Sequence, residues 1–445
     1  MDGTLAAADL ELLRKDFSAN PTYRLAQNAV TRVSVDDVAI NREIINNVDH
    51  SLSTHLDDWK VTNQERSGRC WLFAGLNLLR VGVMRKTGLK EFEFSQNHAM
   101  FWDKIERANY FLEAIIETAD RDLDDRTVAF LQESVASDGG QWNMFAALVA
   151  KHGLVPKGYM PETNSSSNTG RMNSILRYLL HQGARSVRAA VADGGIESAR
   201  AEKAEILRTV HRVLCIHLGT PPERFDWQWT DKDKQFHRDG VLTPQEFAAK
   251  YVDLPLDDYV CLVHDPRPTS PSGRTFTVEY LGNVVGGPPV KYLNVDVSLI
   301  KQIATKTLEG GEPVWFGCDV GKMMSNDYAV WDSELYDLPS VYDAEFSLDK
   351  AARLAFHETQ MTHAMLFTGV DVLDGVARRW RVENSWGSDR GKEGFYTMND
   401  SWFGEYVFEI AARRDALPED LQKALDTEPI VLPAWDPMGA LAHRA

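Results

Sequence analysis

The hydrophobic pattern of the first third of the chain predicts two helices. From Cys70 to Met84 the run CWLFAGLNLLRVGVM is apolar on nearly every side, so we expect a helix that is buried all round. Gly88 is placed to end this helix. A second helix is predicted to begin after Ser95, because serine is a favourable N-cap.

Later segments change from helical to strand-like patterning. The stretch 164–170, NSSSNTG, has the composition of a linker, and Thr243-Pro244 marks another helix start. Beyond about residue 290 the apolar runs are short and rich in β-formers, and Asp374-Gly375 lies between two of them as a hairpin turn. Helices first and an antiparallel sheet late predict an α+β fold, whose two halves face each other across a cleft.

Composition removes several classes of function. The chain has 445 residues, 44% of them hydrophobic, and a net charge of -17. The densest basic patch, 378–381, alternates with apolar residues and is interpreted as a solvated strand face, so nucleic acid is not expected as a main partner. No signal-peptide-like or membrane-spanning run is present. The four cysteines show no CxxC pairing, which favours a reduced, cytoplasmic protein without a metal site.

Cys70 has the sequence context of a nucleophile. It stands at the predicted start of the buried helix, where backbone N–H groups and the helix dipole are expected to lower the thiol pKa, typically to ~3.5–7.5. Gln64 precedes it in a polar loop, and its side-chain amide is a candidate partner of the Cys70 N–H in an oxyanion hole. Cys215, Cys261 and Cys318 lack such company and are interpreted as packing residues.

The segment VTNQERSGRCWLF resembles the nucleophile loop of the papain superfamily, and Glu383-Asn384-Ser385-Trp386-Gly387 resembles the segment carrying its orienting asparagine. The resemblance implies that Cys70 is the nucleophile, that His363 is the base, and that Asn384 fixes the imidazole. It also implies that Trp386 shields the His–Asn hydrogen bond. His357 is the alternative base, but it lies in a helix-like stretch rather than at the start of a strand.

His363 follows Cys70 by about 290 residues, compared with the ~130–150 usual in small papain-like enzymes, so a large insertion is expected. SGRCWLFAGLN, DGGQWNM and the tail EPIVLPAWDPMGALA are similar to the bleomycin hydrolase and aminopeptidase C branch. That resemblance implies a papain-like two-lobed fold: a helical lobe, a β-barrel-like lobe, a large mostly helical insertion and two terminal arms. The expected segments are 1–60 (N-terminal arm), 61–165 (helical lobe), 166–290 (insertion), 291–425 (β-rich lobe) and 426–445 (C-terminal arm).

The branch further implies a homohexamer in which each C-terminal arm occupies its own cleft. The carboxylate at the end of the arm would hold the free amine of a peptide, and Gly139 and Gly140 would pair with the substrate backbone. The family tail ends at Ala442, whereas this chain continues for three residues, 443–445. Either the enzyme removes them, or its carboxylate lies elsewhere and end-recognition weakens.

The predicted function is that of an intracellular cysteine aminopeptidase that needs no cofactor and acts on peptides with free N-termini. Two alternatives remain open from the sequence. One is a papain-like endopeptidase. The other is a non-catalytic assembly protein that binds peptide or nucleic acid. Gly139-Gly140 is also compatible with a simple turn, and the apolar tail with burial at a subunit contact.

Overall fold

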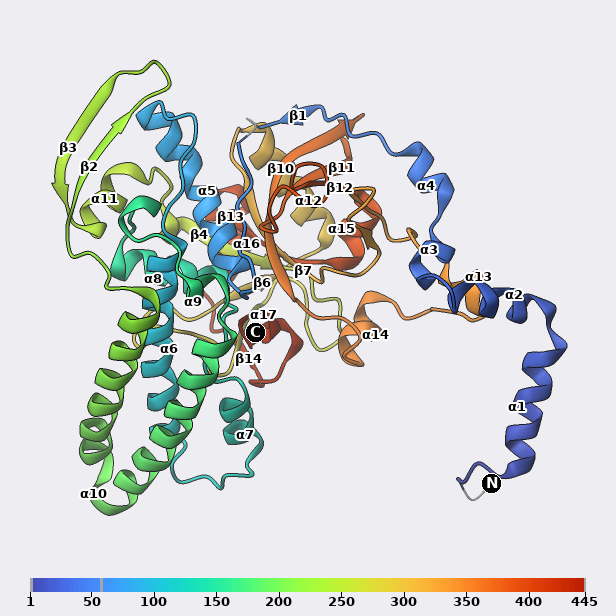
Figure 1. The fold of residues 1–445 in the computed structure, drawn as a ribbon, viewed down its shortest axis with the longest axis horizontal. Helices are drawn as coiled ribbons and strands as arrows, with labels where there is room; N and C mark the ends of the chain where they lie inside the picture. The colour runs from blue at the N-terminus through green and yellow to red at the C-terminus, as the bar shows by residue number, and fades with distance from the viewer. Residues whose placement is uncertain (1–2, 57–58, 444–445) are drawn as a thin grey trace.

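The computed structural model describes residues 3–56 and 59–443. Figure 1 shows a helical half beside a sheet-containing half, with the C-terminal segment returning to the region between them. One hydrophobic core lies under the long helices and reaches the facing side of the sheet, and a second core fills the sheet half behind it. The predicted α+β class is confirmed.

The first two predicted helices are confirmed. Helix α5 (Cys70–Thr87) is buried along most of its length and ends at Gly88, whose φ of 66° is the left-handed conformation that glycine adopts most readily. Helix α6 (Gln96–Glu117) is capped by Ser95, whose side chain accepts a hydrogen bond from the His98 N–H at 3.0 Å. Helix α8 (Trp142–His152) packs against both.

Among the described residues, twelve strands form one sheet that is antiparallel at most of its pairings. Its centre joins β7, β10, β11 and β13, and the Asp374-Gly375 turn between β10 and β11 has φ values of 51° and 79°. The predicted hairpin is therefore confirmed. The strands used below are β4 (Tyr259–Val263), β5 (Thr275–Val278), β6 (Tyr292–Asn294), β7 (Val314–Cys318), β10 (His363–Leu373), β11 (Val376–Glu383), β12 (Phe395–Asn399) and β13 (Val407–Arg413).

The middle of the chain differs from the expectation in two places. The stretch predicted as a linker contains helix α9 (Asn164–Ser167), because Thr163 and Ser166 form a capping box at its start. Strand β4 pairs with β13, so residues before the expected boundary at 291 already contribute strands to the sheet. Between them lie α10 (Gly170–Leu218), the hairpin of β2 (Phe225–Thr230) and β3 (Phe236–Leu242), and α11 (Pro244–Tyr251), which begins as predicted at Thr243-Pro244.

Helix α10 folds back on itself as two antiparallel limbs. The chain leaves helical geometry at Gly195, where φ is 74°, and this break makes the reversal that Figure 1 shows. The limbs pack against α6 and extend the helical half away from the sheet.

Both ends of the chain form arms. At the N-terminus, α1 (Ala7–Ala19) and α2 (Pro21–Val30) bury no residue and extend away from the body in Figure 1. They are followed by α3 (Val35–Ala39) and α4 (Arg42–Asn47). At the C-terminus, β14 (Ile430–Leu432) pairs with β5, and the short helix α17 (Ala440–His443) follows. Within the described ranges, no helix is both long and apolar enough to cross a membrane.

Candidate active site

Cys70 and His363 face one cavity between the two halves. Cys70 is the first residue of α5 and His363 the first residue of β10. Both line a cavity of about 470 Å³, together with Gln64, Gly139 and Leu441. A larger cavity of about 1080 Å³ lies elsewhere, near His50 and Trp59, and none of the predicted catalytic side chains lines it. Cavity size alone would therefore have indicated the wrong site.

The hydrogen bonds around Asn384 fix the tautomer of His363. The Ser385 N–H donates to Asn384 Oδ1 at 2.7 Å, so this oxygen is the acceptor in that position. His363 Nε2 lies 2.9 Å from the same oxygen and must donate its proton to it. In the neutral imidazole, Nδ1 is then left without a proton and available as a base. The contact has the geometry that the orienting role implied for Asn384 requires, and the role itself stays a prediction.

Trp386 lies beside this pair, with its ring centroid 5.1 Å from that of His363. His363 is buried and Asn384 is 1% exposed, so little water reaches their hydrogen bond. The predicted shielding position of Trp386 thus agrees with its placement. His357, the alternative base, follows α14 (Lys350–Ala355), is exposed, and does not line the cavity.

Gln64 is held in one orientation by two hydrogen bonds. Its Nε2 donates to the Ser67 carbonyl at 2.5 Å, and its Oε1 accepts from the Ser385 hydroxyl at 2.6 Å. Because an amide nitrogen carries two protons, one N–H remains for a ligand in the cavity. The Cys70 N–H is at the first position of its helix, where no intrahelical acceptor exists. These are the two donors that an oxyanion hole requires.

The pKa of Cys70, the predicted nucleophile, departs from the sequence-based expectation. Burial raises the pKa of the Cys70 thiol to about 11, and the N–H groups of Ala364, Trp71 and Cys70 itself only partly oppose it. Burial also lowers the pKa of His363 to about 4, against the hydrogen bond with Asn384. The prediction of a thiol pKa lowered by the helix terminus was wrong, because desolvation outweighs the N–H groups. Moving the thiol proton to His363 creates two opposite charges together, whose attraction offsets part of this penalty.

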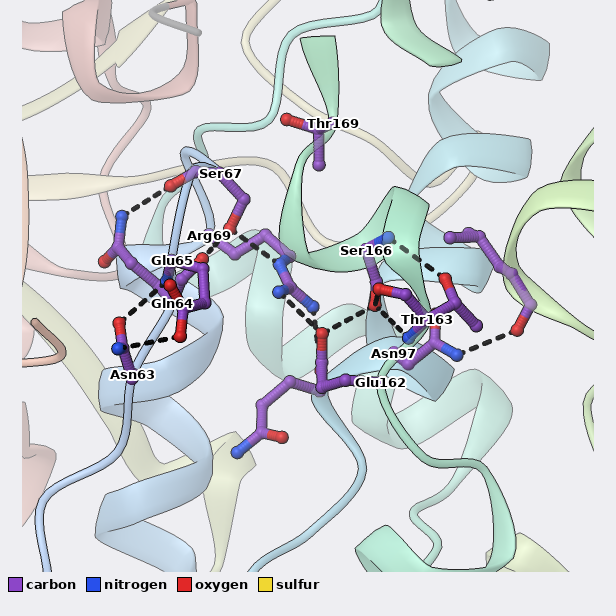
Figure 2. Close-up of polar contacts among 12 residues, drawn as sticks. Asn63, Gln64, Glu65, Ser67, Arg69, Asn97, Glu162, Thr163, Ser166 and Thr169 are labelled. Atoms are coloured by element: carbon purple, nitrogen blue, oxygen red, sulfur yellow. Dashed lines mark hydrogen bonds and ion pairs between the residues drawn. The ribbon is translucent and has the colours of Figure 1, made fainter. Parts of the chain in front are cut away.

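The loop before Cys70 is anchored by a polar network that Figure 2 shows. Arg69 is 1% exposed and makes a bidentate pair with Glu162 at 3.0 and 2.8 Å. Its Nε donates to Ser67 Oγ at 2.9 Å, so the same side chain also fixes the loop that carries Gln64. Bidentate Arg–carboxylate pairs hold their partners in a defined geometry, which suits a loop that must position catalytic donors.

Asp138 ties the glycine segment to the nucleophile loop. Its carboxylate accepts from Thr169 at 2.6 Å and from the Gly68 N–H at 3.1 Å, and pairs with Lys104 at 2.6 Å. Burial acts to raise the pKa of Asp138, but the Lys104 ammonium and the hydrogen bonds outweigh it and hold the pKa well below its ordinary value. The carboxylate therefore stays ionised inside the protein.

Gly139 forms part of the cavity wall, and Gly140 packs behind it against the Trp71 ring. Gly139 lines the cavity beside Cys70. A Cβ atom on Gly140 would lie 2.4 Å from the Trp71 ring, so this position requires glycine. The Trp71 indole N–H donates to the Asp138 carbonyl at 2.7 Å and keeps the wall against the nucleophile helix. Pairing of Gly139 and Gly140 with a substrate backbone stays a prediction.

The described part of the C-terminal arm reaches the same cleft. Leu441 lines the cavity, and Ala442 is 1% exposed. Upstream, Asp436 pairs with Arg267 at 2.9 Å and fixes the arm to the sheet half. His443 lies against the Phe130 ring, and burial lowers its pKa to about 3. Arg444 and Ala445, which the sequence analysis singled out, lie outside the described residues.

Several residues of the site were missed by sequence reasoning. Ser385 orients Gln64, Lys104 compensates Asp138, and Arg107 contacts both the glycine wall and the arm. Lys104 and Arg107 lie in the segment FWDKIERANYFL, where two basic residues on an otherwise buried helix were the available signal. Across residues 3–56 and 59–443, no group of three or more His, Cys, Asp or Glu side chains is arranged to hold a metal.

Comparison with known proteins agrees with this geometry. Residues 4–439 match the Peptidase C1-like family. The chain is 40% identical to aminopeptidase C of Lactobacillus delbrueckii subsp. lactis and 41% identical to bleomycin hydrolase of Homo sapiens, in each case over 97% of both chains. The crystal structure of PepW from Lactobacillus rhamnosis aligns with a TM-score of 0.96 and 41% identity over 99% of both chains. The chain belongs to the Peptidase C1-like family, with the papain-like fold and the bleomycin hydrolase and aminopeptidase C resemblance that its motifs predicted.

Proposed function

We propose that this protein is a cysteine aminopeptidase that removes N-terminal residues from peptides through a thioester on Cys70. The observation that carries the proposal is the position of the C-terminal arm, whose Leu441 lines the cavity that contains Cys70 and His363. An arm that fills one end of the cleft leaves room for only a short part of a peptide before the scissile bond. Full-length similarity to an aminopeptidase C supports the same reading.

In this mechanism His363 Nδ1 takes the proton of the Cys70 thiol as Sγ attacks the carbonyl carbon of the first residue. The Cys70 N–H and the remaining N–H of Gln64 Nε2 bind the oxyanion that forms. His363 then protonates the leaving amine, the C–N bond breaks, and the first residue stays on sulfur as a thioester. Water, deprotonated by His363, hydrolyses the thioester and regenerates the thiol. Asn384 keeps the imidazole in the required tautomer throughout.

End-selectivity follows from charge in the cleft. A carboxylate at the end of the arm would face the ammonium of a free N-terminus, and charge-assisted hydrogen bonds of this type are about twice as strong as neutral ones. We propose a cytoplasmic location on the basis of the cysteine pattern, and a homohexameric assembly on the basis of the family resemblance. The endopeptidase alternative predicts cleavage without regard to the N-terminus, and a non-catalytic binding protein predicts none.

The test compares a fluorogenic peptide with a free N-terminus and the same peptide N-acetylated. We expect kcat/KM for the free peptide to exceed that for the acetylated one at least about tenfold, corresponding to one charge-assisted contact. The intact chain and a version ending at Ala442 are measured in parallel, which shows whether residues 443–445 affect the amine site. Equal cleavage of both peptides would make the enzyme an endopeptidase.

A further inference from the structure

Arg107 contacts both the C-terminal arm and the cavity wall at Gly139, two segments far apart in the sequence. It lies on α6, and its side chain is 12% exposed. One terminal nitrogen, Nη1, donates to the Ala442 carbonyl at 3.3 Å, and the other, Nη2, donates to the Gly139 carbonyl. The two terminal nitrogens of one guanidinium therefore bind the C-terminal arm at Ala442 and the cavity wall at Gly139.

We infer that Arg107 is the positioning residue that sets how far the C-terminal arm reaches into the cleft, and so determines the selectivity for a free N-terminus. The inference rests on the proposed aminopeptidase function and adds to it the residue by which the arm is placed. Arg107 does not line the cavity, so in this inference it acts through its contacts with Ala442 and Gly139.

The guanidinium is itself held in place from behind. Arg107 Nε lies 2.8 Å from Asp103 Oδ2, and Asp103 accepts a further hydrogen bond from Asn283 at 3.0 Å. Asp103 is 2% exposed. Burial raises the pKa of Asp103, and the guanidinium opposes this rise, so the two form a buried ion pair. The guanidinium is planar, so fixing its Nε also fixes the positions of both terminal nitrogens. The single ammonium of a flexible lysine cannot hold two acceptors in this way.

Charge at the end of the arm also favours this role. In the described structure the Arg107–Asp103 pair is neutral, and its contact with the arm is a peptide carbonyl. If the chain ended at Ala442, a carboxylate oxygen would take the place of that carbonyl, and the three groups together would carry one negative charge. Arg107 would then hold the carboxylate while the net negative charge remained available to a substrate ammonium.

A purely structural role makes a different prediction. Arg107 also lies over the Trp71 ring, with Cζ 5.7 Å from its centroid, and Trp71 follows the nucleophile. If Arg107 only supported Trp71, its loss would slow cleavage of every substrate by the same factor. If it positions the arm, its loss changes the ratio between free and acetylated peptides. The ratio is the readout that separates the two.

The experiment uses Arg107→Gln and Arg107→Lys in the full chain, and each again in a chain ending at Gly439. Arg200→Met serves as the control. Arg200 lies on α10 and pairs with Glu113, which is on α6 like Arg107, and this pair is away from the arm. Reactive thiol is counted with an irreversible thiol-directed epoxide, and kcat/KM is expressed per reactive site. This corrects for any variant that folds incompletely.

In the full chain we expect Arg107→Gln to lower the free-to-acetylated ratio about tenfold or more, as for the loss of a hydrogen bond from a charged group. The free-to-acetylated ratio of Arg107→Lys should lie between those of the parent and Arg107→Gln, and the ratio of Arg200→Met should equal that of the parent. In the chain ending at Gly439 the ratio should already be low, and Arg107→Gln should not lower it further. An unchanged ratio for Arg107→Gln in the full chain, or an equal drop with and without the arm, would overturn the inference. A parent enzyme with no preference would instead contradict the proposed function.

Discussion

Cys70→Ala is expected to reduce peptide hydrolysis at least about 10⁴-fold, because in the proposed mechanism the Cys70 sulfur forms the covalent intermediate. His363→Ala should have an effect of similar size, since no other described imidazole lines the cavity. Effects of a nucleophile and its base are not additive, so the double variant should be no slower than either single variant. The measurement is kcat/KM with a free-amine peptide.

Two matched substitutions control this prediction. Cys215 lies on α10 in contact with His211 at 3.7 Å and is outside the cavity, so Cys215→Ala should retain parental activity. His357→Ala should do the same, because His357 is exposed and away from Cys70. Residual activity above about 1% in Cys70→Ala, well beyond the background left by the oxyanion hole and binding alone, would rule out Cys70 as the nucleophile.

Lys104→Met is expected to lower the free energy of unfolding by about 3–5 kcal/mol at neutral pH. The Lys104 ammonium lies 2.6 Å from Asp138 and donates to the carbonyls of Ala136 and Ser137. Both side chains of the ion pair are at most 2% exposed. Methionine has a similar length, so the main change is that Asp138 remains buried without its counter-charge. Urea denaturation followed by tryptophan fluorescence measures the difference.

The pH dependence gives this prediction a second readout. The pKa of Asp138 is depressed, so its contribution to stability is present above the unfolded value and is lost as the pH falls through the folded value. Without Lys104 that pKa should rise, and acid should then neutralise the stranded carboxylate. The gap between parent and variant should therefore narrow from pH 7 to pH 4. Lys151→Met, which removes a half-exposed partner of Glu106, should cost at most about 1 kcal/mol. A gap independent of pH would contradict the account.

The sequence predicted those features of the fold that are set by residues close to one another in the chain. The all-round apolar run, the Ser95 cap, the Gly88 stop and the Asp374-Gly375 turn each specify a conformation through neighbours in sequence. The linker prediction failed because Thr163 and Ser166 cap each other, which turns a loop-like composition into a short helix. The expected boundary at residue 291 left β4 out of the sheet, because the pairing of β4 with β13 joins residues about 150 positions apart and no local pattern reports such pairing.

The site divides in the same way. Gln64, Cys70, His363 and Asn384 could be proposed as catalytic residues from the sequence because each lies in a short motif. The charge state of Cys70 depends on how deeply the folded protein buries it, and the sequence did not show this. The direction of the thiol pKa shift was therefore predicted wrongly. Lys104 and Arg107 could not be assigned roles from sequence, because each is defined by atoms on the distant glycine segment and, for Arg107, on the arm as well.

The mass of the covalent intermediate shows whether Cys70 forms a thioester with the first residue of the peptide alone. A peptide with a free N-terminus is mixed with the enzyme, quenched in acid within one turnover, and the enzyme is digested and analysed by mass spectrometry. The account predicts that the fragment containing Cys70 gains the mass of the first residue alone, bound as a thioester. An adduct carrying several residues of the peptide, or an adduct on any other side chain, would contradict it.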